Sequence, residues 1–97
     1  MYEESASSVT VVNNSEYIVE DIYLSDRIHQ YEIGSVLPNE ILNKQIHFKS
    51  EGSVRYFFQS NGVKYKGTIF GDVTDGLGVS GEIVIDESGE VKVFFNI

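Results

Sequence analysis

The sequence predicts an all-β protein, an immunoglobulin-like antiparallel β-sandwich of about seven or eight strands. Valine, isoleucine, tyrosine and phenylalanine supply most of the apolar content, and these residues favour strands. Short apolar-rich runs recur roughly every eight to twelve residues between turn-forming residues, and no long helical periodicity is present. Asn61-Gly62, between two such runs, is a strong local signal for a tight hairpin. A small β-barrel is the alternative architecture.

The chain is short enough for a single domain with one core. Residues 1–8 are small and polar and are predicted to form a flexible N-terminal tether, which leaves residues 9–97 as the β-sandwich domain. The first strand is expected over residues 9–12, because the turn-forming cluster of residues 13–15 follows it.

Three further strands are expected before the central hairpin. The second covers residues 17–25 and the third covers residues 28–33. Pro38, the only proline, suits the second position of a turn because its φ is fixed. The fourth strand is therefore expected after this turn, over residues 41–49.

The central hairpin joins residues 53–60 to residues 63–70 through a type I′ turn at Asn61-Gly62. This register separates an apolar face from a mostly polar face, whereas a slip by one residue would mix them. It predicts the interior pairs Val54 with Ile69, Tyr56 with Gly67, and Phe58 with Tyr65.

A loop over residues 71–78 leads to a closing hairpin of residues 79–86 and 90–96. A three-residue connection with Gly89 in the left-handed conformation keeps the apolar residues of both strands on one face. It pairs Ile85 with Val91, Ile83 with Val93, and Gly81 with Phe95. Alternation predicts an interior made of Val11, Ile18, Ile22, Leu24, Leu42, Ile46, Phe48, Val54, Tyr56, Phe58, Val63, Tyr65, Ile69, Ile83, Ile85, Val91, Val93 and Phe95.

Charge and cysteine content exclude several classes of function. Seven basic residues stand against 15 acidic ones, for a net charge of −8, and such a surface repels nucleic acids and anionic membranes. No cysteine is present, so neither a disulfide nor a thiolate metal site can form. No apolar run is long enough to span a membrane, and no signal peptide is visible. Residues 1–8 nevertheless resemble a tether after a processed N-terminus, so a periplasmic, secreted or lipid-anchored location is expected, and a natural cytosolic start is the alternative.

The sequence offers no catalytic constellation, and the protein is predicted not to be an enzyme. His29 and His47 lie on different predicted strands, and no serine lies in a nucleophile elbow. Asp72 and Asp75, with Asp86 as a third candidate, are the residues most suited to a calcium ion. Their spacing does not match a calcium-binding loop, so a solvated turn is the favoured interpretation, and neither cofactor nor metal is expected.

A surface patch is the main candidate for binding. Several aromatic residues fall on the outward face of the two hairpins together with basic residues, and an apolar patch with a charged rim is typical of a protein interface. If both hairpins belong to one sheet, the patch comprises Arg55, Phe57, Lys66, Phe70, Lys92 and Phe94. The alternative is that the basic side chains merely cover the rings.

The front half of the chain carries three matching segments: Val11-Val12-Asn13-Asn14-Ser15, Val19-Glu20-Asp21-Ile22-Tyr23-Leu24, and Ile33-Gly34-Ser35-Val36-Leu37-Pro38-Asn39-Glu40. They resemble small Ig-like modules of bacterial envelope proteins, of the FxLYD type, over about a third of the chain. Asn39 stands where those modules have glycine, and the Phe-x-Leu-Tyr-Asp signature is missing. The resemblance implies an extracytoplasmic, non-enzymatic module.

These observations predict a binding module that works outside the cytoplasm and recognises a protein partner of unknown identity. A weak homodimer is also compatible with an exposed patch. The alternative is an acidic inhibitor or immunity-type protein that uses the loop of residues 71–78 against a basic partner.

Overall fold

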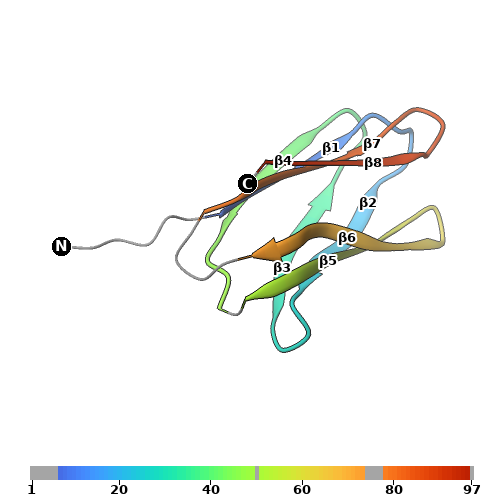
Figure 1. Cartoon of the computed structure of the whole chain (residues 1–97). Helices are drawn as coiled ribbons and strands as arrows, with labels where there is room; N and C mark the ends of the chain where they lie inside the picture. Colours follow the sequence, from blue (N-terminus) through green and yellow to red (C-terminus); the bar gives the residue numbers. More distant parts are fainter. Residues whose placement is uncertain (1–6, 50, 74–77, 97) are drawn as a thin grey trace.

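The computed structural model describes residues 7–49, 51–73 and 78–96. These residues form eight strands in two packed sheets, seen as separate layers in Figure 1, and contain no helix. The β-sandwich is thus confirmed, and the sheets are not closed into a barrel. The strands are β1 (Ser7–Asn13), β2 (Val19–Ser25), β3 (Gln30–Val36), β4 (Ile41–Ile46), β5 (Gly52–Ser60), β6 (Val63–Val73), β7 (Ser80–Ile85) and β8 (Val91–Asn96).

Each sheet contains four strands. Sheet A has the order β4-β1-β7-β8, and sheet B has the order β3-β2-β5-β6. All neighbours are antiparallel except β1 and β7, which run parallel. The two predicted hairpins therefore lie in different sheets, because β5 and β6 belong to sheet B whereas β7 and β8 belong to sheet A.

The turns of both hairpins are those that the sequence predicts. Asn61 and Gly62 have φ angles of 50° and 76°, as a type I′ turn requires, and the predicted pairing holds from Ser60–Val63 to Arg55–Thr68. Gly89 has a φ of 86°, and every predicted pair of the closing hairpin is present. Local turn chemistry therefore determines both registers.

A β-bulge in β6 ends the predicted register of the central hairpin. Val54 pairs with Phe70, whereas the sequence predicts a pair with Ile69. The extra residue places Ile69 and Phe70 on the same side of the sheet, and both are buried. The predicted outward position of Phe70 is therefore wrong.

A second bulge changes the interior face of β2. The pairing shifts by one residue between Glu20 and Tyr23, and Asp21 has a φ of 53°. Val19 is consequently buried together with Ile22, and the predicted interior residue Ile18 is exposed.

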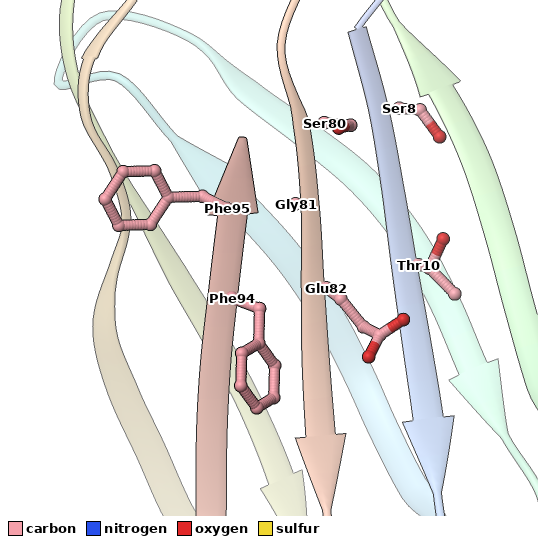
Figure 2. A pocket seen from close by; sticks show the side chains of 7 residues that line it. All are labelled: Ser8, Thr10, Ser80, Gly81, Glu82, Phe94 and Phe95. Atoms are coloured by element: carbon pink, nitrogen blue, oxygen red, sulfur yellow. The ribbon is translucent and has the colours of Figure 1, made fainter. Parts of the chain in front are cut away.

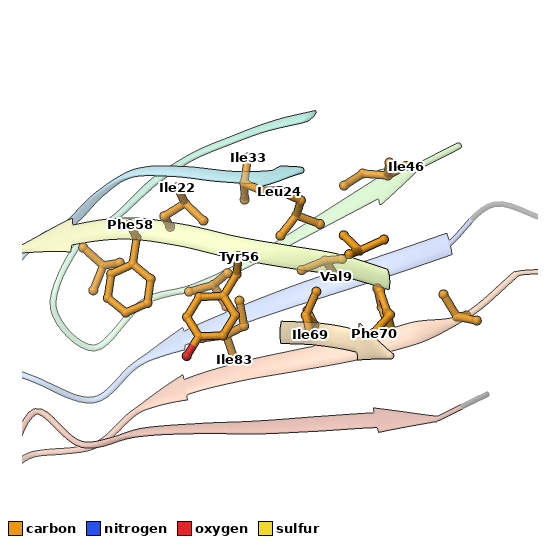
Figure 3. Packing of buried hydrophobic residues seen from close by; sticks show 14 of the residues in the cluster. Val9, Ile22, Leu24, Ile33, Ile46, Tyr56, Phe58, Ile69, Phe70 and Ile83 are labelled. Atoms are coloured by element: carbon orange, nitrogen blue, oxygen red, sulfur yellow. The ribbon is translucent and has the colours of Figure 1, made fainter. Parts of the chain in front are cut away.

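Most of the predicted interior is buried between the sheets, as Figure 3 shows. Val63 and Phe95 are exposed instead, at strand positions where the facing sheet does not cover them. Leu42, Tyr65, Val91 and Val93 are partly buried against the core. The core also contains residues that the prediction omits: Val9, Val19, Ile33, Val36, Phe70, Val73 and Val79.

The first strand begins before the predicted end of the tether. β1 starts at Ser7, which is buried, and its hydroxyl accepts a hydrogen bond of 3.1 Å from the Val79 amide. The Ser8 amide in turn donates to the Val79 carbonyl at 2.9 Å. Residues 7 and 8 therefore belong to sheet A, and residues 1–6 lie outside the described residues.

A close contact between the sheets lies at Gly81. A Cβ atom there would be 2.8 Å from Cζ of Phe70 and 3.0 Å from Cδ1 of Ile69, so the absent side chain leaves the space that the Phe70 ring occupies. Phe95 pairs with Gly81 as the sequence predicts, but the ring that lies over the glycine is that of Phe70 in the facing sheet. At Gly67 the ring of the predicted partner, Tyr56, does lie over the glycine, because a Cβ atom there would be 2.6 Å from that ring.

Asn13 holds the corner where the chain passes from sheet A to sheet B. Its buried side-chain amide donates to the carbonyls of Tyr17 at 2.8 Å and Val36 at 3.1 Å. Its side-chain oxygen accepts bonds from the Ser15 amide at 3.0 Å and the Ser15 hydroxyl at 2.6 Å. Asn13 thus joins the β1–β2 corner to the end of β3, and its own polar atoms are satisfied.

Asp26 holds the loop between β2 and β3. Its carboxylate is almost fully buried and accepts bonds from the amides of Ile28 at 3.1 Å and His29 at 2.7 Å, and from the Tyr31 hydroxyl at 2.7 Å. The Tyr31 hydroxyl accepts a bond of 2.9 Å from the Lys49 amide, which ties the loop to the segment after β4. This loop delays the start of β3 to Gln30, two residues after the predicted start.

We expect Gly81→Ala to lower the free energy of unfolding by about 1–3 kcal/mol, because the buried Phe70 ring cannot move away from a new methyl group. Gly71→Ala is the matched control, since no atom lies within 4 Å of its Cβ position, and its effect should stay within about 0.5 kcal/mol. Urea denaturation measures both. If the contact is the cause, adding Phe70→Leu should make Gly81→Ala less costly, and equal effects of the two alanines would contradict it.

Asp26 should make stability depend on pH. Burial alone raises the pKa of its carboxyl, but the hydrogen bonds it accepts, foremost that from the His29 amide, outweigh burial and lower the pKa below its ordinary value. The contribution is therefore complete above the pKa of an unfolded aspartate, about 3.9, and is lost as the pH falls through the lower folded value.

We expect Asp26→Asn to reduce stability by about 1–3 kcal/mol at neutral pH, because the amide nitrogen cannot accept the Tyr31 hydrogen bond. The difference from wild type should shrink in acid, below the folded pKa. Thermal unfolding across this pH range measures it, with the exposed Asp72→Asn as control. A difference that does not change with pH would show that the charge of Asp26 does not stabilise the fold.

Candidate functional site

The predicted patch is not one surface. Its residues on β5 and β6 lie in sheet B, and those on β8 lie in sheet A, so their outward faces point in opposite directions. Phe70 belongs to neither face, because it is buried in the core. The prediction of a contiguous patch is therefore wrong, and Arg55, Phe57 and Lys66 are separated from Lys92 and Phe94.

On the outer face of sheet B, the ring of Phe57 stacks on Tyr23 with 4.8 Å between ring centroids and 11° between ring planes. The guanidinium carbon of Arg55 lies 5.7 Å from the centroid of Phe57. Lys66 is exposed and pairs directly with Phe57 across the strands. The basic side chain of Arg55 therefore does cover part of a ring, as the alternative interpretation predicts.

The outer face and free edge of sheet A form the best candidate site. β8 is an edge strand, with β7 on one side and no strand on the other among the described residues. Phe94 and Phe95 are 56% and 57% exposed, and their rings point to different sides of β8 in Figure 2. Beside them is an open groove of about 320 Å³ lined by Ser8, Thr10, Ser80, Gly81, Glu82, Phe94 and Phe95. This set of residues is called the β8 groove below.

The floor of the β8 groove is polar and ordered by one side chain. The amide of Asn43, on β4, donates hydrogen bonds to the hydroxyls of Ser8 at 2.9 Å and Thr10 at 2.8 Å. Thr10 pairs with Glu82, and Glu82 pairs with Phe94, so hydroxyl, carboxylate and ring follow one another across the sheet (Figure 2). The groove therefore offers hydrogen-bonding groups and a negative charge next to exposed aromatic surface.

An apolar row continues this surface toward the opposite edge of sheet A. Pairing aligns Ile41, Val12, Val84 and Lys92 across β4, β1, β7 and β8. Ile41 is exposed, and Val12 and Val84 are half-buried. The methylene chain of Lys92 lies at the end of this row, where such a side chain commonly covers apolar surface and keeps its charge in water.

The sequence pattern does not predict the exposure of Phe95 or the groove beside it. Alternation assigns Phe95 to the interior, but the ring of Phe70 occupies the space over Gly81 and β8 is at the edge of its sheet. Phe95 is therefore left exposed. The alternation within each strand predicts that four residues of the β8 groove face outward: Ser8, Thr10, Glu82 and Phe94. Only the order of the strands in sheet A brings them together.

The acidic residues considered for a cation are not gathered. Asp72 is exposed near the end of β6, and Asp86 directly follows β7. The strands β6 and β7 end at opposite ends of the sandwich (Figure 1). The carboxylate of Asp86 accepts bonds from Ser88 and Glu90 within its turn, and the bond from the Ser88 hydroxyl lowers its pKa. Asp75 lies outside the described residues. The described part of the chain holds no group of three residues suited to a metal ion and no helix able to span a membrane.

Comparisons with known proteins bear on the fold alone. No protein-family model matches the sequence, and no curated protein is significantly similar to it. The structure is similar to the NMR structure of a protein from Eubacterium rectale, with a TM-score of 0.62 and 15% sequence identity. The similarity covers 92% of this chain and 86% of that chain, so it includes both sheets of the sandwich.

Single alanine substitutions should distinguish the surface rings from the buried ring. We expect Phe70→Ala to cost about 3–5 kcal/mol of stability, since it empties a fully buried site. Phe94→Ala should stay within about 0.5 kcal/mol, and Phe57→Ala should lose about 0.5–1.5 kcal/mol with its stack on Tyr23. Guanidinium denaturation gives this order, and a large loss from Phe94→Ala would show that its ring is structural.

Proposed function

We propose that the protein is a non-enzymatic module that binds an extended segment of a protein partner along β8. The observation that carries this proposal is the pair of exposed aromatic residues, Phe94 and Phe95, on a free edge strand. Edge strands present unpaired backbone groups that an extended peptide can use, and exposed aromatic rings commonly anchor protein partners.

The β8 groove suggests the chemistry of that partner. Phe94, Phe95 and the apolar row suit aliphatic or aromatic side chains, whereas Glu82 suits a lysine or arginine. The net charge of −8 also favours approach of a basic segment. An extended segment that carries both apolar and basic side chains on one face fits this surface, because Phe94 and Glu82 lie on the same face of sheet A.

A location outside the cytoplasm belongs to the same proposal. It rests on the resemblance of residues 11–15, 19–24 and 33–40 to Ig-like envelope modules and on the polar composition of residues 1–8. The alternative function, an acidic inhibitor that uses residues 71–78, rests on the net charge and on the exposure of Asp72.

Selection from a displayed library of random peptides against the wild-type protein tests the proposal, and a Phe94→Ser/Phe95→Ser variant is then used to compare the affinity of each enriched peptide. We expect enriched peptides to bind the wild type at least about tenfold more tightly than this variant by calorimetry. The control is Tyr17→Ser/Ile18→Ser, which removes two exposed apolar side chains elsewhere and should bind normally.

The position of the bound peptide separates the two functions. Amide chemical-shift changes should concentrate on residues 91–96 and on the neighbouring outer face of sheet A. Changes confined to residues 71–78, with affinity that falls steeply as salt rises, would favour the inhibitor and overturn the proposal. Peptides that bind the double variant as tightly as the wild type would overturn it as well.

A further inference from the structure

The outer face of sheet B has an ordered pattern of charge that the β8 groove does not involve. One row across the four strands contains Glu32, Tyr23, Phe57 and Lys66. The next row contains Glu20, Gln59 and Lys64. In both rows the acidic residue lies on the β3–β2 side and the basic residue lies on the β5–β6 side. This set of residues is called the sheet B face.

No ion pair of Glu20, Glu32, Lys64 or Lys66 exists among the described residues. Glu32 and Lys66 are three strand spacings apart, roughly 14 Å, which is too far for a direct contact. The arrangement therefore leaves two separated half-faces of opposite charge.

Aromatic surface occupies the middle of the sheet B face. Tyr23 and Phe57 are stacked and half-buried, so part of the ring pair is open to solvent. A hollow of about 210 Å³ adjoins the rings and is lined partly by Asp21, Gln59 and Lys64. An apolar centre between charged margins is the usual composition of a protein interface.

We propose that the sheet B face binds a second copy of the same chain, through a two-fold axis that runs parallel to the strands. A rotation of 180° about this axis places β3 of one copy opposite β6 of the other, and β2 opposite β5. Each row of one copy then lies opposite the same row of the other copy. Glu32 of one copy then faces Lys66 of the second copy, and Glu20 faces Gln59, which lies beside Lys64 in its row. Tyr23 of one copy faces Phe57 of the other at the axis, so every contact occurs twice.

The geometry of sheet packing permits this arrangement. Two sheets pack face to face about 10 Å apart with their strands within about 30° of alignment, so long side chains in the central rows can reach across. The pairing of Glu32 with Lys66 favours a two-fold axis parallel to the strands. An axis that lay in the interface but ran perpendicular to the strands would place β3 opposite β3 and β6 opposite β6, and so would bring like charges together. The proposal does not depend on the proposed function, since the β8 groove lies on the other sheet.

Charge-reversed variants test the proposal. Their self-association is measured by sedimentation equilibrium at protein concentrations up to about 1 mM, so that a weak dimer is detected. We expect wild type to dimerise, and Glu32→Lys and Lys66→Glu each to weaken the dimer at least about tenfold. Because the two variants carry opposite changes on facing positions, an equimolar mixture should recover dimerisation as a heterodimer. The combined Glu32→Lys/Lys66→Glu chain should also dimerise as wild type does.

Two matched variants control for net charge. Glu40→Lys and Lys44→Glu change the net charge by the same amounts but lie outside sheet B, and dimerisation should be unaffected. Amide spectra of each variant establish that it is folded. A wild-type chain that stays monomeric throughout, or a mixture that associates no better than its separate components, would overturn the proposal.

Discussion

The contact of Phe70 with Gly81 is the constraint on which much of the structure depends. The bulge in β6 turns Phe70 inward beside Ile69, and the missing side chain at Gly81 lets the ring reach the opposite sheet. The same ring packs edge-on against Phe48, with 5.8 Å between centroids. The sheets meet closely at this end, and the interior position opposite Gly81 is already filled. Phe95 is therefore exposed at the edge, where it helps to form the β8 groove.

The division of the hairpins between two sheets gives the molecule two different outer faces. Sheet A presents aromatic and aliphatic side chains at a free edge, next to a polar floor that Asn43 orders. Sheet B presents a stacked aromatic pair between an acidic and a basic margin. We propose a different partner for each surface, an extended segment for the β8 groove and a second copy for the sheet B face, and the two surfaces lie on different sheets.

Buried polar side chains hold two of the connections between strands, and the first of these is where the chain passes from sheet A to sheet B. Asn13 satisfies its donors and acceptors at the corner after β1, and Asp26 satisfies its carboxylate within the β2–β3 loop. An unpaired polar group in either place would be costly, so these bonds favour one path of the chain. The sequence shows residues 13–15 as a turn, but it does not show that Asn13 reaches Val36, because that bond spans 23 residues.

The sequence by itself determined the β-sandwich, the two hairpins and their turns, because alternation and the Asn61-Gly62 and Gly89 turns act between residues that are close along the chain. It did not determine the bulges in β2 and β6, which reversed Ile18 and Phe70 relative to the core. It also did not determine the sheet to which each hairpin belongs, and this separated Phe57 from Phe94. Strand order, edge position and contact across the sheets arise from packing between distant segments, so only the tertiary structure decided which exposed residues share a face.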